Sequence, residues 1–159
     1  MKFILDSEEE LELMIFNSWE SNGICPVDGE EWQIMERQLN FGNYGRPDIV
    51  KVRIDCFEPN TPILNICIME IKKESVNEKT FSQVFRYKNC VDILKKKFNL
   101  DNAIVGVQVV APEMNMNGDT CFLYNELYHF IDCYTFNFSV DGLKFQLLDS
   151  GWQKGGGVD

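Results

Sequence analysis

Apolar positions near the N-terminus recur with the period of a helix. We predict a helix over residues 7–19, with Ser7 as its N-cap and three glutamates in the first turn, where acidic side chains suit the helix dipole. One face of this helix carries the apolar residues Leu11, Met14, Ile15 and Trp19. Residues 21–32 have the composition of a loop, and the pattern of residues 32–39 fits either a strand or a helix.

Two apolar stretches in the middle of the chain have the length and composition of strands. Residues 49–54 and 63–71 flank a turn-rich segment, so we predict that they form a β-hairpin. A helix is predicted to follow, opened by a capping box at either Ser75 or Thr80 and running to about Phe98. Its inner face is predicted to carry Val84, Tyr87, Val91, Leu94 and Phe98.

The last third of the chain adds a strand, a helix and a hairpin. Residues 103–110 are a wholly apolar run, which is typical of a strand covered on both faces. Residues 120–131 predict a helix, and residues 134–148 predict a hairpin with Asp141 and Gly142 at its turn. The order of elements predicts a mixed α/β (α+β) fold, in which helices flank a central mixed sheet and a β-hairpin ends the chain.

Length and composition favour one globular domain. The chain has 159 residues, 45% of them hydrophobic, so we predict a single domain over residues 1–150 and a flexible tail at 151–159. No apolar run approaches the roughly 20 residues of a membrane-spanning helix, and we expect no membrane association and no secretory signal. The six cysteines lack metal-site spacing, so we expect reduced core thiols in a cytoplasmic protein. The single histidine, His129, is interpreted as a packing residue.

The charge of the chain is unevenly distributed. The formal net charge of −10 by itself disfavours a nucleic-acid partner. Residues 46–97, however, hold eleven Lys and Arg against seven Asp and Glu, while the rest of the chain holds four against eighteen. The basic segment therefore still allows a partner that carries phosphate groups.

The predicted central hairpin ends in charged side chains. If its strands pair antiparallel around Pro59, three apolar cross-strand pairs share one face: Ile54 with Leu64, Val52 with Ile66, and Val50 with Ile68. Asp48 then faces Glu70, and Lys72 follows on the same face. Opposed carboxylates destabilise a sheet unless something neutralises them, and oxygen ligands suit Mg²⁺ or Mn²⁺. The alternative is a strand end whose charges are simply solvated.

These residues together resemble the PD-(D/E)XK nuclease superfamily. The resemblance rests on Gly45-Arg46-Pro47-Asp48, on Glu70-Ile71-Lys72 after an apolar strand, and on Gln83-x-x-x-Tyr87 in the next helix. It extends over roughly residues 7–112 and is greatest to the RecB-like branch and the NucS-type endonucleases. It implies a restriction-endonuclease-like core with a four-stranded mixed sheet, and magnesium-dependent hydrolysis of phosphodiester bonds, with DNA as the expected substrate in repair, recombination, restriction or phage DNA processing.

The resemblance also implies roles for individual residues. Asp48, Glu70 and the backbone carbonyl of Ile71 would hold Mg²⁺ or Mn²⁺, and Lys72 would orient the attacking water or stabilise developing charge. Gln83 would orient the nucleophile or Lys72, and Tyr87 would brace the same helix face. The first-helix acid would be Glu8, with Glu12 as the reserve. The expected phosphate contacts are Arg46, Lys73 and Arg86.

A second hypothesis is a catalytically idle, acidic nuclease-fold protein that binds a protein partner or mimics DNA. The chain shows no counterpart of the extra DNA-binding domain of NucS-type enzymes, and its charge outside residues 46–97 is strongly acidic. The C-terminal hairpin could also provide a homodimer interface. The residues do not distinguish DNA from RNA as a substrate.

Overall fold

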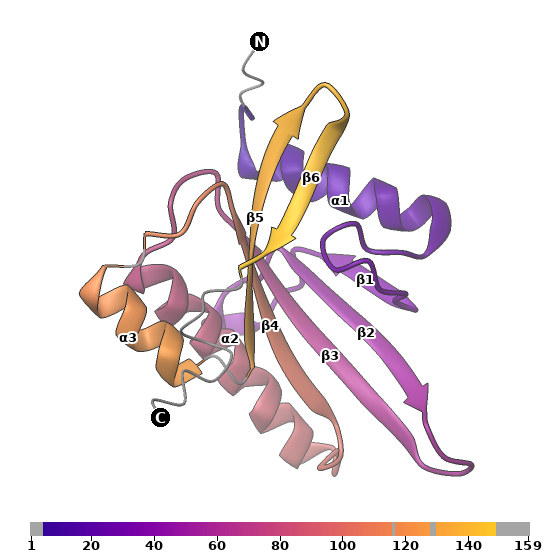
Figure 1. Cartoon of the computed structure of the whole chain (residues 1–159). Coiled ribbons are helices and arrows are strands. Elements are labelled where there is room, and N and C mark those ends of the chain that lie inside the picture. The colour runs from indigo at the N-terminus through magenta and orange to yellow at the C-terminus, as the bar shows by residue number, and fades with distance from the viewer. Residues whose placement is uncertain (1–4, 116, 128–129, 149–159) are drawn as a thin grey trace, which may run out of the picture.

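The chain is built around a six-stranded mixed β-sheet with helices on both faces (Figure 1). The computed structural model describes residues 5–115, 117–127 and 130–148, so His129 and the predicted tail at 151–159 lie outside the described residues. The elements in chain order are α1 (Glu8–Asn22), β1 (Ile34–Arg37), the 3-10 helix η1 (Gly42–Tyr44), β2 (Ile49–Cys56), β3 (Pro62–Ile71), α2 (Glu78–Lys97), β4 (Ile104–Ala111), α3 (Gly118–Leu127), β5 (Ile131–Ser139) and β6 (Gly142–Leu147). The predicted fold class is confirmed, with two more strands among these residues than the resemblance implied.

The strands lie in the sheet in the order in which they occur along the chain. The pairs β1–β2, β2–β3 and β5–β6 are antiparallel, whereas β3–β4 and β4–β5 are parallel. The predicted register of the central hairpin is confirmed by three cross-strand pairs, Ile54 with Leu64, Val52 with Ile66, and Val50 with Ile68. Ile49 and Met69 form the pair at the end of this ladder, so Asp48 and Glu70 lie one residue beyond it.

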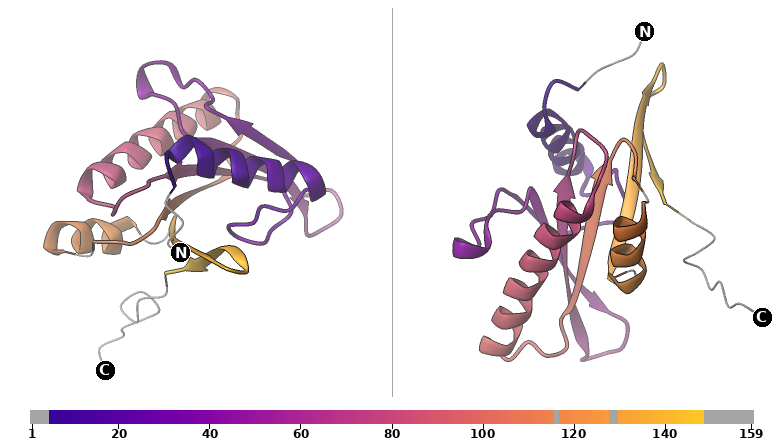
Figure 2. Two further views of the ribbon diagram at one scale, coloured as in Figure 1. Left: turned by 90° about the horizontal axis from the view of Figure 1, so that it is seen from above. Right: turned by 90° about the vertical axis from the view of Figure 1, so that its left-hand side faces the viewer.

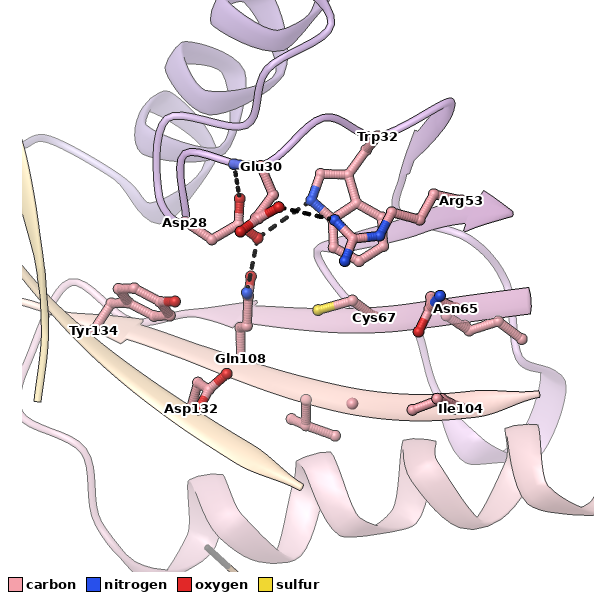
Figure 3. Close-up of a pocket in the computed structure, with 13 residues that line it drawn as sticks. Asp28, Glu30, Trp32, Arg53, Asn65, Cys67, Ile104, Gln108, Asp132 and Tyr134 are labelled. Atoms are coloured by element: carbon pink, nitrogen blue, oxygen red, sulfur yellow. Dashed lines mark hydrogen bonds and ion pairs between the residues drawn. The ribbon is translucent and has the colours of Figure 1, made fainter. Parts of the chain in front are cut away.

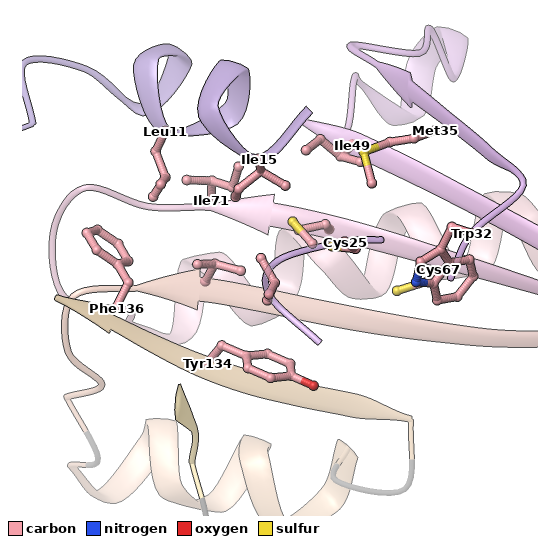
Figure 4. Packing of buried hydrophobic residues seen from close by; sticks show 13 residues of the cluster. Leu11, Ile15, Cys25, Trp32, Met35, Ile49, Cys67, Ile71, Tyr134 and Phe136 are labelled. Atoms are coloured by element: carbon pink, nitrogen blue, oxygen red, sulfur yellow. The ribbon is translucent and has the colours of Figure 1, made fainter. Parts of the chain in front are cut away.

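Each face of the sheet buries a separate hydrophobic cluster, because successive side chains of a strand point to opposite faces. On one face, Leu11 and Ile15 of α1 pack over Ile49 and Ile71, as Figure 4 shows. On the other face, α2 and α3 lie side by side over β3, β4 and β5 (Figures 1 and 2). Helices from both faces therefore approach the same end of β3, where the charged residues lie.

Side-chain caps define where both long helices begin. The Ser7 hydroxyl accepts a hydrogen bond from the Glu10 amide at 3.2 Å, so the predicted cap of α1 is confirmed. Helix α2 is capped instead by Asn77, whose side chain accepts from the Lys79 amide, so both predicted capping boxes were wrong. An Asn two residues after Ser75 provides the same kind of oxygen acceptor at the position where the chain turns into the helix.

The buried stripe of α2 is shorter than its apolar periodicity suggested. Val84, Tyr87 and Val91 are buried as predicted, whereas Leu94 and Phe98 are exposed. The prediction for these two was wrong because periodicity reports one apolar face but not where the packing partner ends. Leu94 therefore stays in solvent although it continues the spacing of the buried residues.

Three other predictions are sharpened by the structure. The ambiguous segment 32–39 contains strand β1. The C-terminal hairpin forms, but its two loop residues are Val140 and Asp141, and Gly142 begins β6 with a φ of 104°. The helix predicted over 120–131 is α3, which ends before β5 begins at Ile131.

No helix among the described residues has the length and hydropathy to cross a membrane.

The cysteines only partly match the expectation of core thiols. None of the six forms a disulfide, and Cys25, Cys67, Cys90 and Cys133 are buried. Cys56 is exposed at the end of β2, so it does not act as a core hydrophobe.

One buried ion pair joins the loop after α1 to the sheet. Lys51 of β2 is fully buried, and its ammonium contacts the Asp28 carboxylate at 2.5 Å and the Gln108 side-chain oxygen at 2.6 Å. The Trp32 indole donates to the same carboxylate at 3.2 Å, and the ammonium lies 4.5 Å from the centre of the Trp32 ring. A buried charge is tolerated only when it is paired and hydrogen-bonded, so this network anchors the loop.

We predict that Asp28→Ala lowers the free energy of unfolding by about 3 kcal/mol, because it leaves the Lys51 ammonium buried without its carboxylate. The double variant with Lys51→Met should recover part of this loss, since no unpaired charge remains. The matched control is Asp141→Ala, which breaks an exposed pair with Lys144 and should cost less than about 1 kcal/mol. Urea unfolding followed by circular dichroism measures all three, and equal losses for Asp28→Ala and Asp141→Ala would contradict the anchoring role.

Candidate functional site

Four segments distant in the sequence meet at one end of the β2–β3 ladder. Asp48 precedes β2, Glu70 lies near the end of β3, and Lys72 follows that strand. The first turn of α1 approaches from one face of the sheet and the first turns of α2 approach from the other. The sequence-predicted carboxylates and lysine are therefore brought together by the confirmed register of the hairpin.

The Asp48 carboxylate is held by hydrogen bonds to both of its oxygens. Its Oδ2 accepts from the backbone amide of Ile71 at 2.7 Å, and its Oδ1 accepts from the Gln38 side chain at 3.1 Å. The Gln38 amide also donates to the Asp48 carbonyl at 2.9 Å. The Asp48 side chain thus links the start of β2 to the end of β3, beyond the last backbone pair of these two strands.

A chain of hydrogen bonds leads from Glu70 to helix α2. The Lys72 ammonium donates to Glu70 Oε1 at 2.8 Å and to the Gln83 side-chain oxygen at 3.3 Å. The Gln83 amide donates to the Tyr87 hydroxyl at 2.8 Å, which itself donates to the Arg46 carbonyl at 3.1 Å. These contacts fix the Lys72 ammonium between a carboxylate and an amide.

Gly45 allows the loop before β2 to reach Tyr87. Its φ of 104° is unfavourable for residues with a side chain, and a Cβ at this position would lie 3.1 Å from the Tyr87 ring. Tyr87 therefore touches both the glycine and the carbonyl of the next residue, Arg46. This contact holds the loop that presents Asp48.

The two candidate acids of α1 reach different parts of the site. Glu8 Oε1 accepts from the Lys73 amide at 3.2 Å, on the exposed side near Lys72. Glu12 is only 2% exposed, and its two oxygens accept from Arg37 Nε at 2.8 Å and from Gln38 Nε2 at 2.9 Å. Glu12 therefore touches the same amide group that binds Asp48, while the choice of Glu8 as the first-helix acid stays a prediction.

Gln38 is a site residue that the sequence did not reveal. Its side-chain amide joins Glu12 to Asp48, and its backbone has a positive φ of 52°, which is uncommon for a residue other than glycine. Such a backbone conformation costs energy and persists only where the contacts around it hold it in place. The only signal in the sequence was a polar residue at the end of a segment that fitted either a strand or a helix.

Burial shifts the titration of both carboxylates. It raises the pKa of Asp48 to about 6, with the Glu12 charge adding to the effect, and it raises the pKa of Glu70 to about 7, with the Asp48 charge adding to it. Burial alone would lower the pKa of Lys72, but its contact with Glu70 outweighs this and raises the pKa. The pair of acids thus resists carrying two negative charges in the absence of a compensating cation.

The donor set fits a hard divalent cation. Glu70 is 3% exposed, and its Oε2 is buried without a hydrogen-bond partner among the described residues. An orphaned carboxylate oxygen beside a second carboxylate is the kind of group that Mg²⁺ or Mn²⁺ binds. Within residues 5–115, 117–127 and 130–148, no three His, Cys, Asp or Glu side chains form a ready-made metal cluster, so remaining ligands would be backbone oxygens or water.

The predicted phosphate-contact residues are exposed around this site. Arg46 lies beside Tyr87 through its carbonyl, and Lys73 meets Glu8 through its amide, so both side chains remain available. Arg86 is exposed on α2 next to Tyr87. A hollow of about 350 Å³ adjoins Lys72, and Lys79, which the sequence did not single out, lines it beside Lys73.

No protein-family model matches the chain, and no curated protein matches it in sequence. Among solved structures, the chain is similar to the crystal structure of a repair endonuclease from Pyrococcus abyssi, with a TM-score of 0.53 and 21% sequence identity. The similarity covers 85% of this chain and 49% of that chain, so this chain spans about half the length of its neighbour. The likeness shows that this chain and part of that protein share a fold.

We predict that the free energy of unfolding in EDTA falls as the pH rises from about 4 to about 7 on account of this site. The raised pKa values of Asp48 and Glu70 mean that the folded state binds more protons than the unfolded state in this window, so protonation favours folding there. Urea unfolding at pH 5 and pH 8 should show a smaller decline in the Asp48→Asn/Glu70→Gln double variant than in the wild type. An identical decline in both proteins would show that the pair is not desolvated.

Proposed function

We propose that this chain is a divalent-metal-dependent nuclease that hydrolyses phosphodiester bonds in DNA. The observation that carries the proposal is the pairing of half-buried Asp48 with buried Glu70, whose Oε2 has no hydrogen-bond partner among the described residues, beside a lysine held by hydrogen bonds. A binding-only protein has no need to bury such a pair at the end of a strand. The shared fold with a repair endonuclease supports the same reading and favours DNA over RNA.

The residues that would hold the cation are Asp48, Glu70 and the backbone carbonyl of Ile71, as in the PD-(D/E)XK superfamily. When bound, Mg²⁺ or Mn²⁺ polarises a phosphate oxygen and lowers the pKa of a bound water. Asp48 is oriented for this role because the Ile71 amide and the Gln38 side chain fix its carboxylate. Glu8 lies at the rim, where it would act through water.

Lys72 would supply positive charge next to the scissile phosphate. Its ammonium is fixed by Glu70 and Gln83, so it can stabilise negative charge that develops in the transition state or orient the attacking water. Gln83 positions Lys72, and Tyr87 positions Gln83. An arginine would not substitute, because its planar guanidinium cannot occupy the same compact position.

The substrate would lie across the exposed basic groups at the rim. Arg46, Lys73, Arg86 and Lys79 can contact phosphates on either side of the cleaved bond, which orients the strand without reading its sequence. The rest of the chain is acidic, so its repulsion would confine DNA to this rim. Binding should accordingly weaken as salt concentration rises.

Lys72→Met is expected to lower the rate of DNA cleavage in Mg²⁺ by about 10²- to 10³-fold, because it removes the charge that stabilises the reacting phosphate. Asp48→Asn should abolish cleavage, as should EDTA in the wild type. The control is Lys88→Met, which removes a lysine of α2 that is paired with Asp92 one turn further along the helix. This variant should leave the rate within about twofold. Cleavage of single-stranded, double-stranded and branched DNA, with folding checked by circular dichroism, provides the measurement.

Full activity in EDTA, or in folded Lys72→Met, would contradict this mechanism. A folded wild type that neither cleaves any nucleic acid nor binds Mn²⁺ would instead favour the acidic protein-binding alternative.

Gln38→Met is expected to weaken Mn²⁺ binding by about tenfold, because hydrogen-bonded partners of metal ligands typically contribute this much to affinity. The substitution keeps the length of the side chain but removes the amide that joins Glu12 to Asp48. Calorimetric titration with Mn²⁺ measures the change, and Gln146→Met on the exposed strand β6 is the matched control. Equal affinities in the two variants would show that Gln38 does not orient Asp48.

A further inference from the structure

A second hollow lies on the opposite face of the sheet from Glu70 and Lys72. Its volume is about 270 Å³, and it lies between the loop after α1 and the strands β3, β4 and β5, as Figure 3 shows. We call it the loop pocket. Its roof is formed by Asp28, Glu30, Trp32 and Arg53, and its floor includes Cys67, Gly106, Gln108, Asp132 and Tyr134.

Gly106 keeps the floor of the loop pocket open. It pairs with Cys67 in the middle of the sheet, and a Cβ added at Gly106 would meet no atom within 4 Å. The buried positions on either side of this hollow are filled by larger side chains, including Gln108. The pocket therefore exists where β4 lacks a side chain, and a larger residue at this position would fill it without a clash.

Most charges around the loop pocket already have partners. Asp28 is paired with the buried Lys51, and Arg53 is paired with both Glu30 and Asp55 at 3.1 Å. Arg53 also lies 4.8 Å from the centre of the Trp32 ring. These contacts fix the roof and leave it with no net positive charge to offer a ligand.

Two polar groups of the floor have no such partner. Tyr134 is 8% exposed, lines the pocket and makes no side-chain hydrogen bond to any described residue. Asp132 is two residues earlier on β5, and its carboxylate forms no ion pair with the described residues. Burial and the nearby Asp28 charge raise the pKa of Asp132. Burial and the Asp132 charge in turn raise the pKa of Tyr134, so the Tyr134 hydroxyl lies in the electrostatic field of that carboxylate. Asp132 is exposed and Tyr134 is buried, so a carboxylate and a hydroxyl with no side-chain partner among the described residues line the hollow together.

We propose that the loop pocket binds a guanidinium group, with Asp132 as its counter-ion and the Tyr134 hydroxyl as a second acceptor. A planar guanidinium carries donors in a fork that matches a carboxylate, and it packs well against aromatic rings. The volume is at the lower end of small-molecule pockets, so it admits the end of an arginine side chain but not a nucleotide. Acidic residues in the roof and floor would repel a phosphate.

The guanidinium could belong to a small metabolite or to an arginine of a protein partner. The strongly acidic charge outside residues 46–97 would attract either source. The site does not depend on the nuclease proposal, because it shares no residue with Asp48, Glu70 or Lys72.

The test is a titration of the isotope-labelled protein with ethylguanidinium, followed by nuclear magnetic resonance at the Trp32 indole and the Gly106 amide. Both signals should shift and saturate at millimolar concentration, whereas the neutral isostere ethylurea should leave them unchanged. Asp132→Asn should weaken binding at least tenfold, and Gly106→Val should abolish it by filling the pocket. Asp141→Asn, which makes the same change in net charge at an exposed turn, should leave the affinity within twofold.

A second arm compares ethylguanidinium with a short peptide containing one arginine and with the same peptide containing citrulline. Tighter binding of the arginine peptide supports a protein partner, and equal affinity of the two guanidinium probes supports a small metabolite. The proposal is overturned if ethylguanidinium produces no saturable shift, if ethylurea produces the same shift, or if Asp132→Asn and Asp141→Asn weaken binding equally.

Discussion

Two carboxylates share a desolvated position at the end of the β2–β3 ladder, and the rest of the site depends on how their repulsion is managed. Asp48 is fixed by the Ile71 amide and the Gln38 side chain, whereas the Glu70 carboxylate has only Lys72 as a hydrogen-bonded partner among the residues that the structure describes. One oxygen of Glu70 remains buried and unpaired among the described residues. Burying such a group is costly, and the divalent cation that we propose for this site would neutralise it.

The sheet explains why so few residues suffice to build this site. Strand β3 pairs antiparallel with β2 and parallel with β4, and a hydrophobic cluster covers each of its faces. Helix α1 brings Glu8 and Glu12 to its end from one face, and α2 brings Gln83 from the other. The same period-two alternation that buries Ile68 towards α2 also directs Glu70 to that face, while the opposite face holds the loop pocket. One strand therefore serves two separate polar sites.

The sequence predicted those parts of the molecule that follow from local pattern. A turn centred on Pro59 predicted the register that leaves Asp48 and Glu70 just beyond the last pair of the β2–β3 ladder. The resemblance to the PD-(D/E)XK superfamily singled out Gln83 and Tyr87. The roles of Gln38 and Lys51 were missed because each depends on contacts with segments far away in the chain. The Asn77 cap is local, but it was missed because Ser75 and Thr80 each offered a capping box nearby. In the sequence Lys51 is one of eleven basic residues of the segment 46–97, yet it is buried because the loop after α1 supplies Asp28.

The most direct test of the central claim is anomalous scattering from crystals soaked in Mn²⁺ at pH 8, where both carboxylates are ionised. The account predicts an anomalous peak within coordination distance of both Glu70 Oε2 and the Asp48 carboxylate in the wild type, and no peak there in Glu70→Gln. Peaks confined to other surface carboxylates, with Glu70 Oε2 still unpaired, would contradict a metal centre at this end of the sheet.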